Sequence, residues 1–542
     1  MPTVTWPGVS AASPISPERL SQIQARFSHD WVRLCEQARN GSLEPPKDRR
    51  FSGKDWASHP SFLFMAHAYL LSANAMEEMV DAAALDDAVR ERLRFSVMQW
   101  VEAVAPTNFM ATNPEVQRKL IETQGMSLRD GLMNLLGDLQ KGRLTQTDES
   151  QFQVGENLAI TPGSVVYQNT LFQLIQYAPS TDKVYRKPLL LVPPCINKFY
   201  ILDLQPQSSL VRYAVDQGFT VFLISWRNPV PADTDGIEKA AWDDYLEKGV
   251  LQAIQVASAI TRQKTIHTLG FCVGGTLLAS ALALATARGR NPAHSLTLLT
   301  TLLDFREAGV LNVFVDELHA RTREQQIGQG GLMTARELAT TFSFLRPSEL
   351  VWNYVVDNYM KGGTPPAFDL LYWNSDSTNL PGPFFTWYFR NTYLENNLVG
   401  PDHVKVAGYP LDLTAIDTPC YIYGSREDHI VPWPAAYAST RVLSGEKTFV
   451  LGASGHIAGV INPPSRNKRH YWVLDHPQAA LPANPTDWLE SSTQHPGSWW
   501  PHWAGWLREL SGTQVKAPAQ QGSTAYPAIE PAPGSYVKTR AV

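Results

Sequence analysis

The chain of 542 residues is long enough for two or three domains. Hydrophobic residues make up 44% and charged residues 18% of the sequence, which supplies a sizeable core and excludes a globally disordered protein. Lys and Arg (46) against Asp and Glu (51) give a net charge of −5. That balance argues against a protein held on nucleic acid by bulk charge, so we expect no nucleic-acid partner.

Four cysteines (Cys35, Cys195, Cys272 and Cys420) are too few and too scattered for a disulfide framework or a clustered metal site. A reducing compartment, the cytoplasm, is the simpler interpretation, and the N-terminus carries no secretory signal pattern. The most apolar stretch, Val273–Ala287, is shorter than the roughly 20 residues of a membrane span. We expect a soluble protein with no transmembrane segment and no bound metal.

The first part of the chain, residues 1–160, is predicted to be a mainly helical domain. Residues 1–50 are rich in Pro and polar residues and are expected to be partly flexible, except for one helix capped by Ser16 with Pro17 in its first turn. We favour docking of its apolar face on the rest of the chain over contact with a membrane or hydrophobic particle. The residues of that face are Leu20, Ile23, Phe27, Trp31 and Leu34. Three further segments with helical spacing are Phe62–Val80, Asp87–Ala105 and Pro114–Gln140.

After Gly155 short β-rich runs alternate with helical stretches, which indicates an α/β protein with a mostly parallel, doubly wound sheet over 161–542. The alternation breaks between about 305 and 417. This segment is rich in aromatic residues, and we expect a cap or lid inserted over the sheet. Within it, Asn374–Tyr393 is predicted to be irregular, and the tail 515–542 is predicted to be extended. The tryptophans late in the chain favour packing over contact with a ligand.

The sequence Gly270-Phe271-Cys272-Val273-Gly274-Gly275 follows an apolar strand and precedes a helix of small residues. This is the context of the nucleophile elbow G-x-S-x-G, here with cysteine in place of serine. The glycines permit the sharp turn, and the N-terminus of the following helix favours a thiolate. Cys272 is therefore the candidate nucleophile, while Cys195 lacks an elbow and is predicted to be a packing residue.

A carboxylate and a histidine follow Cys272 in the order typical of α/β-hydrolases. Glu427 and Asp428 compete for the acid on the loop after one strand, and Asp428 is favoured. His456 ends the next strand on a glycine-rich loop and is the candidate base, whereas His429 stands beside the acid, where a structural role is more typical. The chemistry is nucleophilic attack on a carbonyl by a thiolate that the imidazole generates.

Stabilising the resulting oxyanion requires two N–H donors. One should be the backbone N–H of Val273, directly after the nucleophile. The other should come from the loop after the strand Pro188–Val192, where Ile196 is favoured and Cys195 is the alternative.

Many segments in order make the chain similar to the polyhydroxyalkanoate (PHA) synthases, specifically to the class I type that acts on short-chain monomers. Cys195 departs from the family pattern, which usually has Trp there. The segments that carry the resemblance are Asp48–Phe51, Ala105–Asn108, Val192–Pro194, Ile196–Leu204, Ser225–Pro229, Gly270–Gly275, Leu380–Pro383, Arg390–Asn396, Gly497–Pro501 and Pro533–Lys538.

The resemblance implies an α/β-hydrolase fold and polymerisation of (R)-3-hydroxyacyl-coenzyme A, such as 3-hydroxybutyryl-coenzyme A, into polyester with release of coenzyme A. It maps the catalytic set onto Cys272, Asp428 and His456, through an acyl-cysteine intermediate, with Asp428 also helping to activate the 3-hydroxyl. It further implies a homodimer associated with PHA granules and no cofactor beyond the substrate's own coenzyme A.

Two alternatives remain from the residues alone. A thioesterase, or a cysteine-dependent hydrolase like dienelactone hydrolase, would carry the same elbow and triad, but it would not need the helical N-terminal region and the aromatic cap. A non-catalytic protein that coats granules would give no reason for a nucleophile, acid and base in order.

Overall fold

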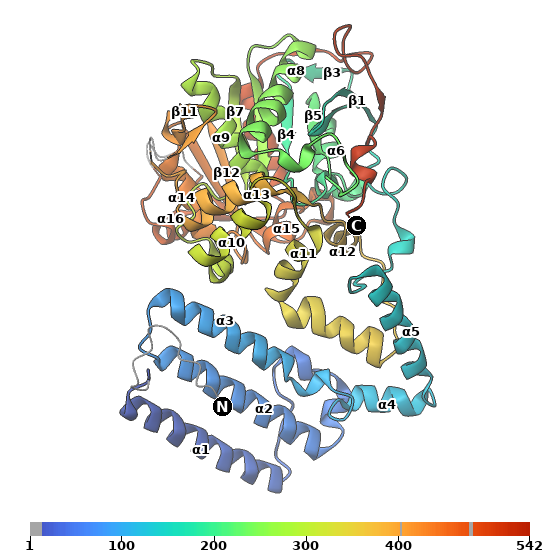
Figure 1. Cartoon of the computed structure of the whole chain (residues 1–542), viewed down its shortest axis with the longest axis vertical. Helices are drawn as coiled ribbons and strands as arrows, with labels where there is room; N and C mark the ends of the chain where they lie inside the picture. Colours follow the sequence, from blue (N-terminus) through green and yellow to red (C-terminus); the bar gives the residue numbers. More distant parts are fainter. Residues whose placement is uncertain (1–13, 401–403, 476–480, 542) are drawn as a thin grey trace. The chain divides into compact units, whose positions relative to one another are not determined.

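The computed structural model describes residues 14–400, 404–475 and 481–541, and the chain divides into two compact units (Figure 1). One unit comprises Met1–Asp148 with Thr340–Ala367, and the other comprises Glu149–Ala339 with Phe368–Val542. From the sequence we expect a boundary near residue 160 and all of 305–417 in the catalytic domain. The structure instead groups residues 340–367 with the N-terminal helices.

The regular secondary structure in the described part of the first unit is helical. The chain enters its residues 340–367 from the second unit within α11 (Ala335–Phe344). Its main helices are α1 (Pro17–Arg39), α2 (Pro60–Ala82), α3 (Asp87–Ala103), α4 (Pro114–Glu122), α5 (Met126–Lys141), η10 (Ser348–Trp352) and η11 (Val355–Met360). Where the sequence predicts helix across Pro114–Gln140, the structure has α4 and α5. They are separated at Gly125, whose φ of 87° is a conformation that a glycine adopts without strain.

Helix α1 begins at the predicted cap, because the side chain of Ser16 accepts a backbone N–H of the first turn at 3.3 Å. Its apolar face packs inside this unit. Ile23 and Leu34 are buried, and the Trp31 ring lies 5.8 Å from the ring of Phe64 on α2. Docking of this face on the chain is therefore observed at Ile23 and Leu34, whereas Trp31 is exposed.

Polar contacts explain why residues 340–367 join the first unit. Asn134 on α5 donates a hydrogen bond from Nδ2 to the carbonyl of Asn358 at 3.0 Å. The hydroxyl of Tyr359 donates to Asp138 at 2.7 Å. Helix η11 therefore completes the polar side of α5, a pairing between distant segments that local sequence patterns do not reveal.

The second unit is built on an 11-stranded sheet with the order β15-β14-β13-β12-β7-β6-β4-β5-β2-β1-β17. The six strands from β13 to β5 are parallel, and antiparallel strands extend the sheet at both edges. The predicted extended tail supplies the edge strand β17, which pairs with β1. The sheet strands are β1 (Gly163–Gln168), β2 (Phe172–Tyr177), β4 (Leu189–Val192), β5 (Val221–Trp226), β6 (Ile266–Phe271), β7 (Ala293–Leu299), β12 (Cys420–Ser425), β13 (Lys447–Gly452), β14 (His470–Val473), β15 (Thr493–Pro496) and β17 (Glu530–Pro531).

Short strands pair in three two-stranded sheets outside this one. They are β3 (Lys183–Tyr185), β8 (Leu332–Met333), β9 (Leu380–Pro381), β10 (Lys405–Val406), β11 (Tyr409–Pro410) and β16 (Gln514–Lys516). The helices of the second unit are α6 (Leu210–Asp216), α7 (Trp242–Asp244), η8 (Tyr245–Leu251), α8 (Gln252–Thr261), α9 (Val273–Ala287), α10 (Glu317–Ile327), α12 (Asp369–Ser375), α13 (Gly382–Tyr388), η12 (Phe389–Leu394), α14 (Trp433–Val442), α15 (His456–Val460), α16 (Pro485–Ser491) and α17 (Trp500–Ser511).

Helices cover both faces of the central sheet (Figure 1). On β4, whose four residues are all buried, Leu190 and Val192 belong to the core under α8, α9 and α14, while Leu189 and Leu191 belong to the core under α6 and α17. Continuous apolar runs are therefore required here, because side chains on both sides of a strand are removed from water. The three tryptophans Trp499, Trp500 and Trp503 are fully buried, and each indole N–H donates a hydrogen bond within the protein, as the packing prediction requires.

The prediction that Asn374–Tyr393 is irregular is wrong. Helix α12 ends in this segment, α13 starts at Gly382, and the π-helix η12 continues the chain from Phe389. Pro383 lies in the first turn of α13, where a helix leaves the N–H groups unbonded, so the proline starts the helix instead of breaking it. Over the parts of the chain that the structure describes, no helix combines the length and the apolar character needed to cross a membrane.

His267 lies on β6 and is fully buried. One ring nitrogen faces the hydroxyl of Ser295 at 2.6 Å, and the other faces that of Ser511 at 3.0 Å. Burial, together with the nearby positive charges of His294 and Lys187, lowers the pKa of His267 to about 3. The folded protein therefore holds this imidazole in its neutral form.

We expect His267 to make the fold sensitive to acid. In the unfolded chain the pKa of His267 is about 6.5. Between about pH 6.5 and pH 3 the unfolded state therefore binds a proton at this residue and the folded state does not, so the free energy of unfolding falls as the pH is lowered. One such proton costs about 1.4 kcal/mol per pH unit, or about 2 kcal/mol between pH 7.5 and pH 5. Urea denaturation at these two pH values should show a clearly smaller loss in His267→Gln than in the wild type. Equal losses in both proteins would contradict this assignment.

Candidate active site

Cys272 occupies a sharp turn between β6 and α9. Its φ of 53° and ψ of −129° are unusual for a residue other than glycine, and its backbone N–H donates to the carbonyl of Leu299 at 3.0 Å. Such strained backbone costs of the order of 1–3 kcal/mol and persists where the surroundings enforce it. The thiol is half-buried and lies at the N-terminus of α9, whose dipole favours a thiolate.

Three glycines make room for this turn. A Cβ on Gly270 would lie 2.4 Å from the Cα of Gly275, and a Cβ on Gly275 would lie 2.1 Å from Oγ1 of Thr301. A Cβ on Gly274 would lie 2.2 Å from the carbonyl oxygen of Val192. The helix after the nucleophile therefore packs directly against the backbone at the end of β4.

Asp428 and His456 come from the loops after β12 and β13, at the same edge of the sheet. One carboxylate oxygen of Asp428 accepts the backbone N–H groups of Ile430 and Val431, each at 2.9 Å, and the other lies 2.6 Å from Nδ1 of His456. The side chain of Asp428 is fully buried, whereas Glu427, the competing acid, is exposed. The structure thus brings Asp428, and not Glu427, to the candidate base.

His456 lies between the carboxylate and the thiol. Its ring stacks on that of Phe271, with centroids 5.7 Å apart, and its side chain interacts with Cys272. Burial alone would lower its pKa, but the negative charge of Asp428 and that of a Cys272 thiolate outweigh burial and raise the pKa to about 10. The imidazole beside Cys272 is therefore a stronger proton acceptor than a free histidine.

The segment Pro193–Lys198, which follows β4, carries the second oxyanion candidate. The hydroxyl of Thr378 donates to the carbonyl of Cys195, and because the two groups of a trans peptide point in opposite directions, the Ile196 N–H points away from Thr378. Burial, with the nearby charge of Cys272, raises the pKa of Cys195, so its thiol is a poor nucleophile, as the packing prediction requires.

The cap places aromatic residues near Cys272 that sequence patterns did not assign. Tyr388 at the end of α13 and Tyr393 on η12 are partly buried, and burial raises the pKa of both, with an added contribution from the charge of Cys272. The ring of Trp242 stacks on Trp387 at 4.7 Å and on Tyr388 at 5.5 Å. The sequence signals in this region were the aromatic composition of the cap and, for Tyr393, the family-like segment Arg390–Asn396.

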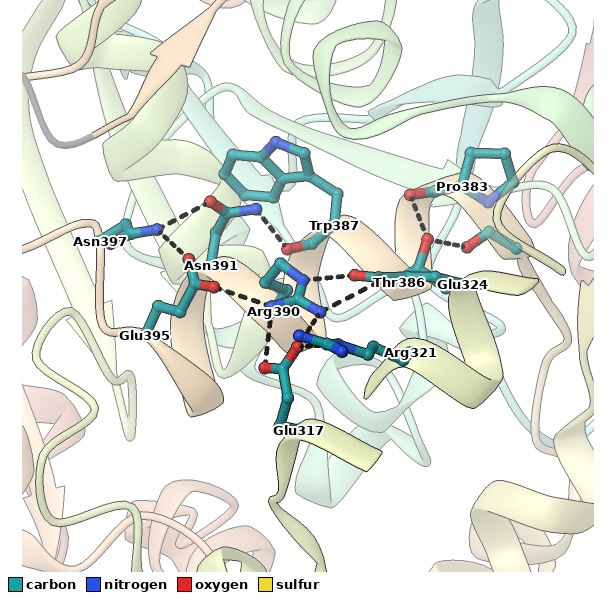
Figure 2. A network of polar contacts seen from close by, with 11 residues as sticks. Glu317, Arg321, Glu324, Pro383, Thr386, Trp387, Arg390, Asn391, Glu395 and Asn397 are labelled. Carbon is teal, nitrogen blue, oxygen red and sulfur yellow. Dashed lines mark hydrogen bonds and ion pairs between the residues drawn. The ribbon is translucent and has the colours of Figure 1, made fainter. Parts of the chain in front are cut away.

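Arg390 ties η12 to α10 through Glu317 and Glu324, and it also pairs with Glu395 directly after η12 (Figure 2). Its guanidinium bonds Glu324 through two nitrogens, and it pairs with Glu317 at 3.2 Å and Glu395 at 2.8 Å. Isolated surface ion pairs contribute little, but a planar guanidinium that is bonded on several sides fixes orientation. The network therefore holds the helix turn between Tyr388 and the end of η12 in one place.

Among residues 14–400, 404–475 and 481–541, no three His, Cys, Asp or Glu side chains are grouped as metal ligands would be.

Two family models match the chain. One, described as the N-terminus of poly-beta-hydroxybutyrate polymerase (PhaC), matches residues 47–214, and the other, described as the alpha/beta hydrolase fold, matches residues 188–463. The second match and the sheet order confirm the predicted fold class.

Three curated proteins are similar to the chain over nearly its whole length. The poly(3-hydroxyalkanoate) polymerase subunit PhaC of Cupriavidus necator is 55% identical, over 99% of this chain and 91% of the relative. The protein of the same name from Rhizobium meliloti is 42% identical, over 97% of this chain and 86% of the relative. The poly(3-hydroxyalkanoate) polymerase of Methylorubrum extorquens is 40% identical, over 97% of this chain and 88% of the relative.

Proposed function

Because the chain belongs to the poly(3-hydroxyalkanoate) polymerase family, we propose that it is an acyltransferase that joins (R)-3-hydroxyacyl groups from coenzyme A thioesters into a polyester and releases coenzyme A. Short-chain monomers such as 3-hydroxybutyryl-coenzyme A are the proposed substrates. The observation that carries the mechanism is the strained cysteine at an elbow beside a buried histidine–aspartate pair 2.6 Å apart.

The first half of the reaction charges the enzyme. His456 takes the proton of Cys272, and the thiolate attacks the thioester carbonyl of the substrate. The backbone N–H groups of Val273 and Ile196 stabilise the oxyanion. The carbon–sulfur bond to coenzyme A breaks, and the leaving thiolate takes the proton from His456.

The second half extends the polymer. The hydroxyl of another 3-hydroxyacyl unit loses its proton to His456 and attacks the acyl-cysteine, which frees the Cys272 thiolate and forms an ester bond. The acyl-cysteine is a thioester like the substrate, so the acyl group stays activated until this step. An oxygen ester on serine would lose that driving force, which accounts for cysteine in the elbow.

Asp428 acts in this scheme through His456. Its side chain is fully buried and both of its oxygens have partners, one being two backbone N–H groups and the other the imidazole. It therefore holds the histidine tautomer and stabilises the imidazolium. The family resemblance implies that Asp428 also helps to activate the 3-hydroxyl, and in this scheme it does so through the imidazole.

Water must be kept from the acyl-enzyme, or hydrolysis competes with chain growth. The stacked rings of Trp242, Trp387 and Tyr388 supply an apolar wall near Cys272. By family resemblance we also propose that the enzyme works as a cytoplasmic homodimer at the surface of PHA granules. It needs no cofactor other than the coenzyme A of its substrate.

The experiment that tests this function is incubation of the purified protein with (R)-3-hydroxybutyryl-coenzyme A. We expect coenzyme A release together with insoluble polyester, and no release from the S enantiomer. Formation of free 3-hydroxybutyrate with no polymer would instead identify a thioesterase. Release of no coenzyme A at all would favour a non-catalytic protein.

A further inference from the structure

Lys198 is a buried charged residue that the proposed reaction does not use. It ends the segment Pro193–Lys198, and only 2% of its surface is exposed. Its ammonium group donates a hydrogen bond to the carbonyl oxygen of Thr539, more than three hundred residues later in the chain. Burial lowers the pKa of Lys198 to about 8, and a lysine is kept in such a place only when it gains specific partners.

The acceptor of this bond is itself held in place. Nδ2 of Asn228 also donates to the Thr539 carbonyl, at 3.1 Å, and Oδ1 of Asn228 accepts the backbone N–H of Asn379 at 2.9 Å. The next residue, Arg540, bonds the hydroxyl of Tyr372 at 2.6 Å. The end of the chain is thereby joined to the cap and to the loop after β5.

The backbone on both sides of Ile196 is held by the cap. Thr378 donates to the carbonyl of Cys195, and the indole N–H of Trp373 donates to the carbonyl of Lys198 at 2.7 Å. The ammonium group of Lys198 adds a third attachment, to Thr539. Loss of that attachment would release the end of the segment from Thr539 and let the backbone that presents the Ile196 N–H shift.

We infer that Lys198 is a positioning residue, and that its bond to Thr539 sets the oxyanion-binding N–H of Ile196. This inference rests on the proposed function, since it assumes an oxyanion at Cys272. Removing one oxyanion donor costs about 10²–10³ in rate, so misplacing one should cost about 10–100-fold. The loss should fall on kcat, because the donor interacts with the transition state more strongly than with the bound substrate.

Two reactions of Cys272 distinguish a misplaced oxyanion donor from a general loss of active-site structure. Attack on a thioester forms an oxyanion, whereas alkylation by iodoacetamide needs the same thiolate and histidine but forms no oxyanion. We would measure coenzyme A release at saturating (R)-3-hydroxybutyryl-coenzyme A and the alkylation rate in Lys198→Met. A second variant, lacking residues 539–542, removes the acceptor and keeps the lysine, which covers the case in which Lys198→Met does not fold. The matched control is Lys538→Met, which replaces an exposed lysine directly before Thr539.

The expected result is a 10–100-fold lower kcat in both variants, with KM changed by less than about threefold and the alkylation rate unchanged. The control should behave as the wild type. Thioester turnover within about threefold of the wild type, or an equal fall in turnover and alkylation, would overturn the inference. Failure of the wild type itself to release coenzyme A would overturn the proposed function instead, so the two failures are distinguishable.

Discussion

Replacing Cys272 with alanine will abolish polymer formation and lower coenzyme A release by roughly 10⁴-fold or more, while the fold is retained. Loss of a nucleophile removes the covalent route entirely, and effects of this size are typical of catalytic triads. A 10⁴-fold loss corresponds to about 5.5 kcal/mol of transition-state stabilisation. Coenzyme A release from (R)-3-hydroxybutyryl-coenzyme A and the urea midpoint of both proteins measure the two parts of this prediction.

Cys272→Ser sharpens the test, because the variant keeps the elbow and a nucleophilic atom. Any acyl group it accepts becomes an oxygen ester, so we expect at most one coenzyme A per active site, an acyl-enzyme detectable by mass spectrometry, and no polymer. Polymer from the alanine variant at more than a few per cent of the wild-type rate would show that Cys272 is not the nucleophile.

Gly274→Ala should weaken the fold and disturb the elbow together. The new Cβ would lie 2.2 Å from the carbonyl oxygen of Val192 and 2.6 Å from that of Pro193, and neither backbone atom can move without shifting β4 or the oxyanion segment. We expect a loss of about 2–4 kcal/mol in the free energy of unfolding, as for other overpacked sites, together with loss of activity.

Gly505→Ala is the matched control for this substitution. Gly505 lies in α17, and the closest heavy atom to its added Cβ is the flexible end of Arg508 at 3.9 Å. There alanine should be neutral or stabilise the protein by up to about 1 kcal/mol through its higher helix propensity. Urea denaturation of the two variants measures the free energy of unfolding of each and so tests this prediction. A Gly274→Ala protein as stable as Gly505→Ala would contradict the packing described for the elbow.

The residues of the site could be predicted from the sequence because each is fixed by local order. Cys272 follows a strand and starts a helix, and Asp428 and His456 each follow a strand, so the ends of neighbouring parallel strands bring them to one edge of the sheet. Asp428 and His456 can pair because the loops that carry them both leave the sheet at that edge. The place of Asp428 in its loop favours it over Glu427, and the structure adds the burial of its side chain, which the sequence does not report.

The cap could not be predicted in the same way. The segment Asn374–Tyr393 was predicted to be irregular, although Pro383 lies in the first turn of α13 and starts that helix. Tyr388 and Tyr393 reach Cys272 through the course of α13 and η12, and Lys198 reaches Thr539 across the fold. These contacts join residues far apart in the chain, and no periodicity in the sequence encodes such a distance.

The contribution of residues 340–367 to the first unit has a consequence for biosynthesis. Asn134 and its partner Asn358 are 224 residues apart, so the N-terminal helices leave the ribosome long before the segment that completes them. While most of the sheet is synthesised, the polar groups of α5 that later bond η11 are solvated by water or covered by a chaperone. The N-terminal unit, although it begins first, is therefore complete only at residue 367, partway through the synthesis of the second unit. Its completion depends on a segment that follows Cys272 in the sequence.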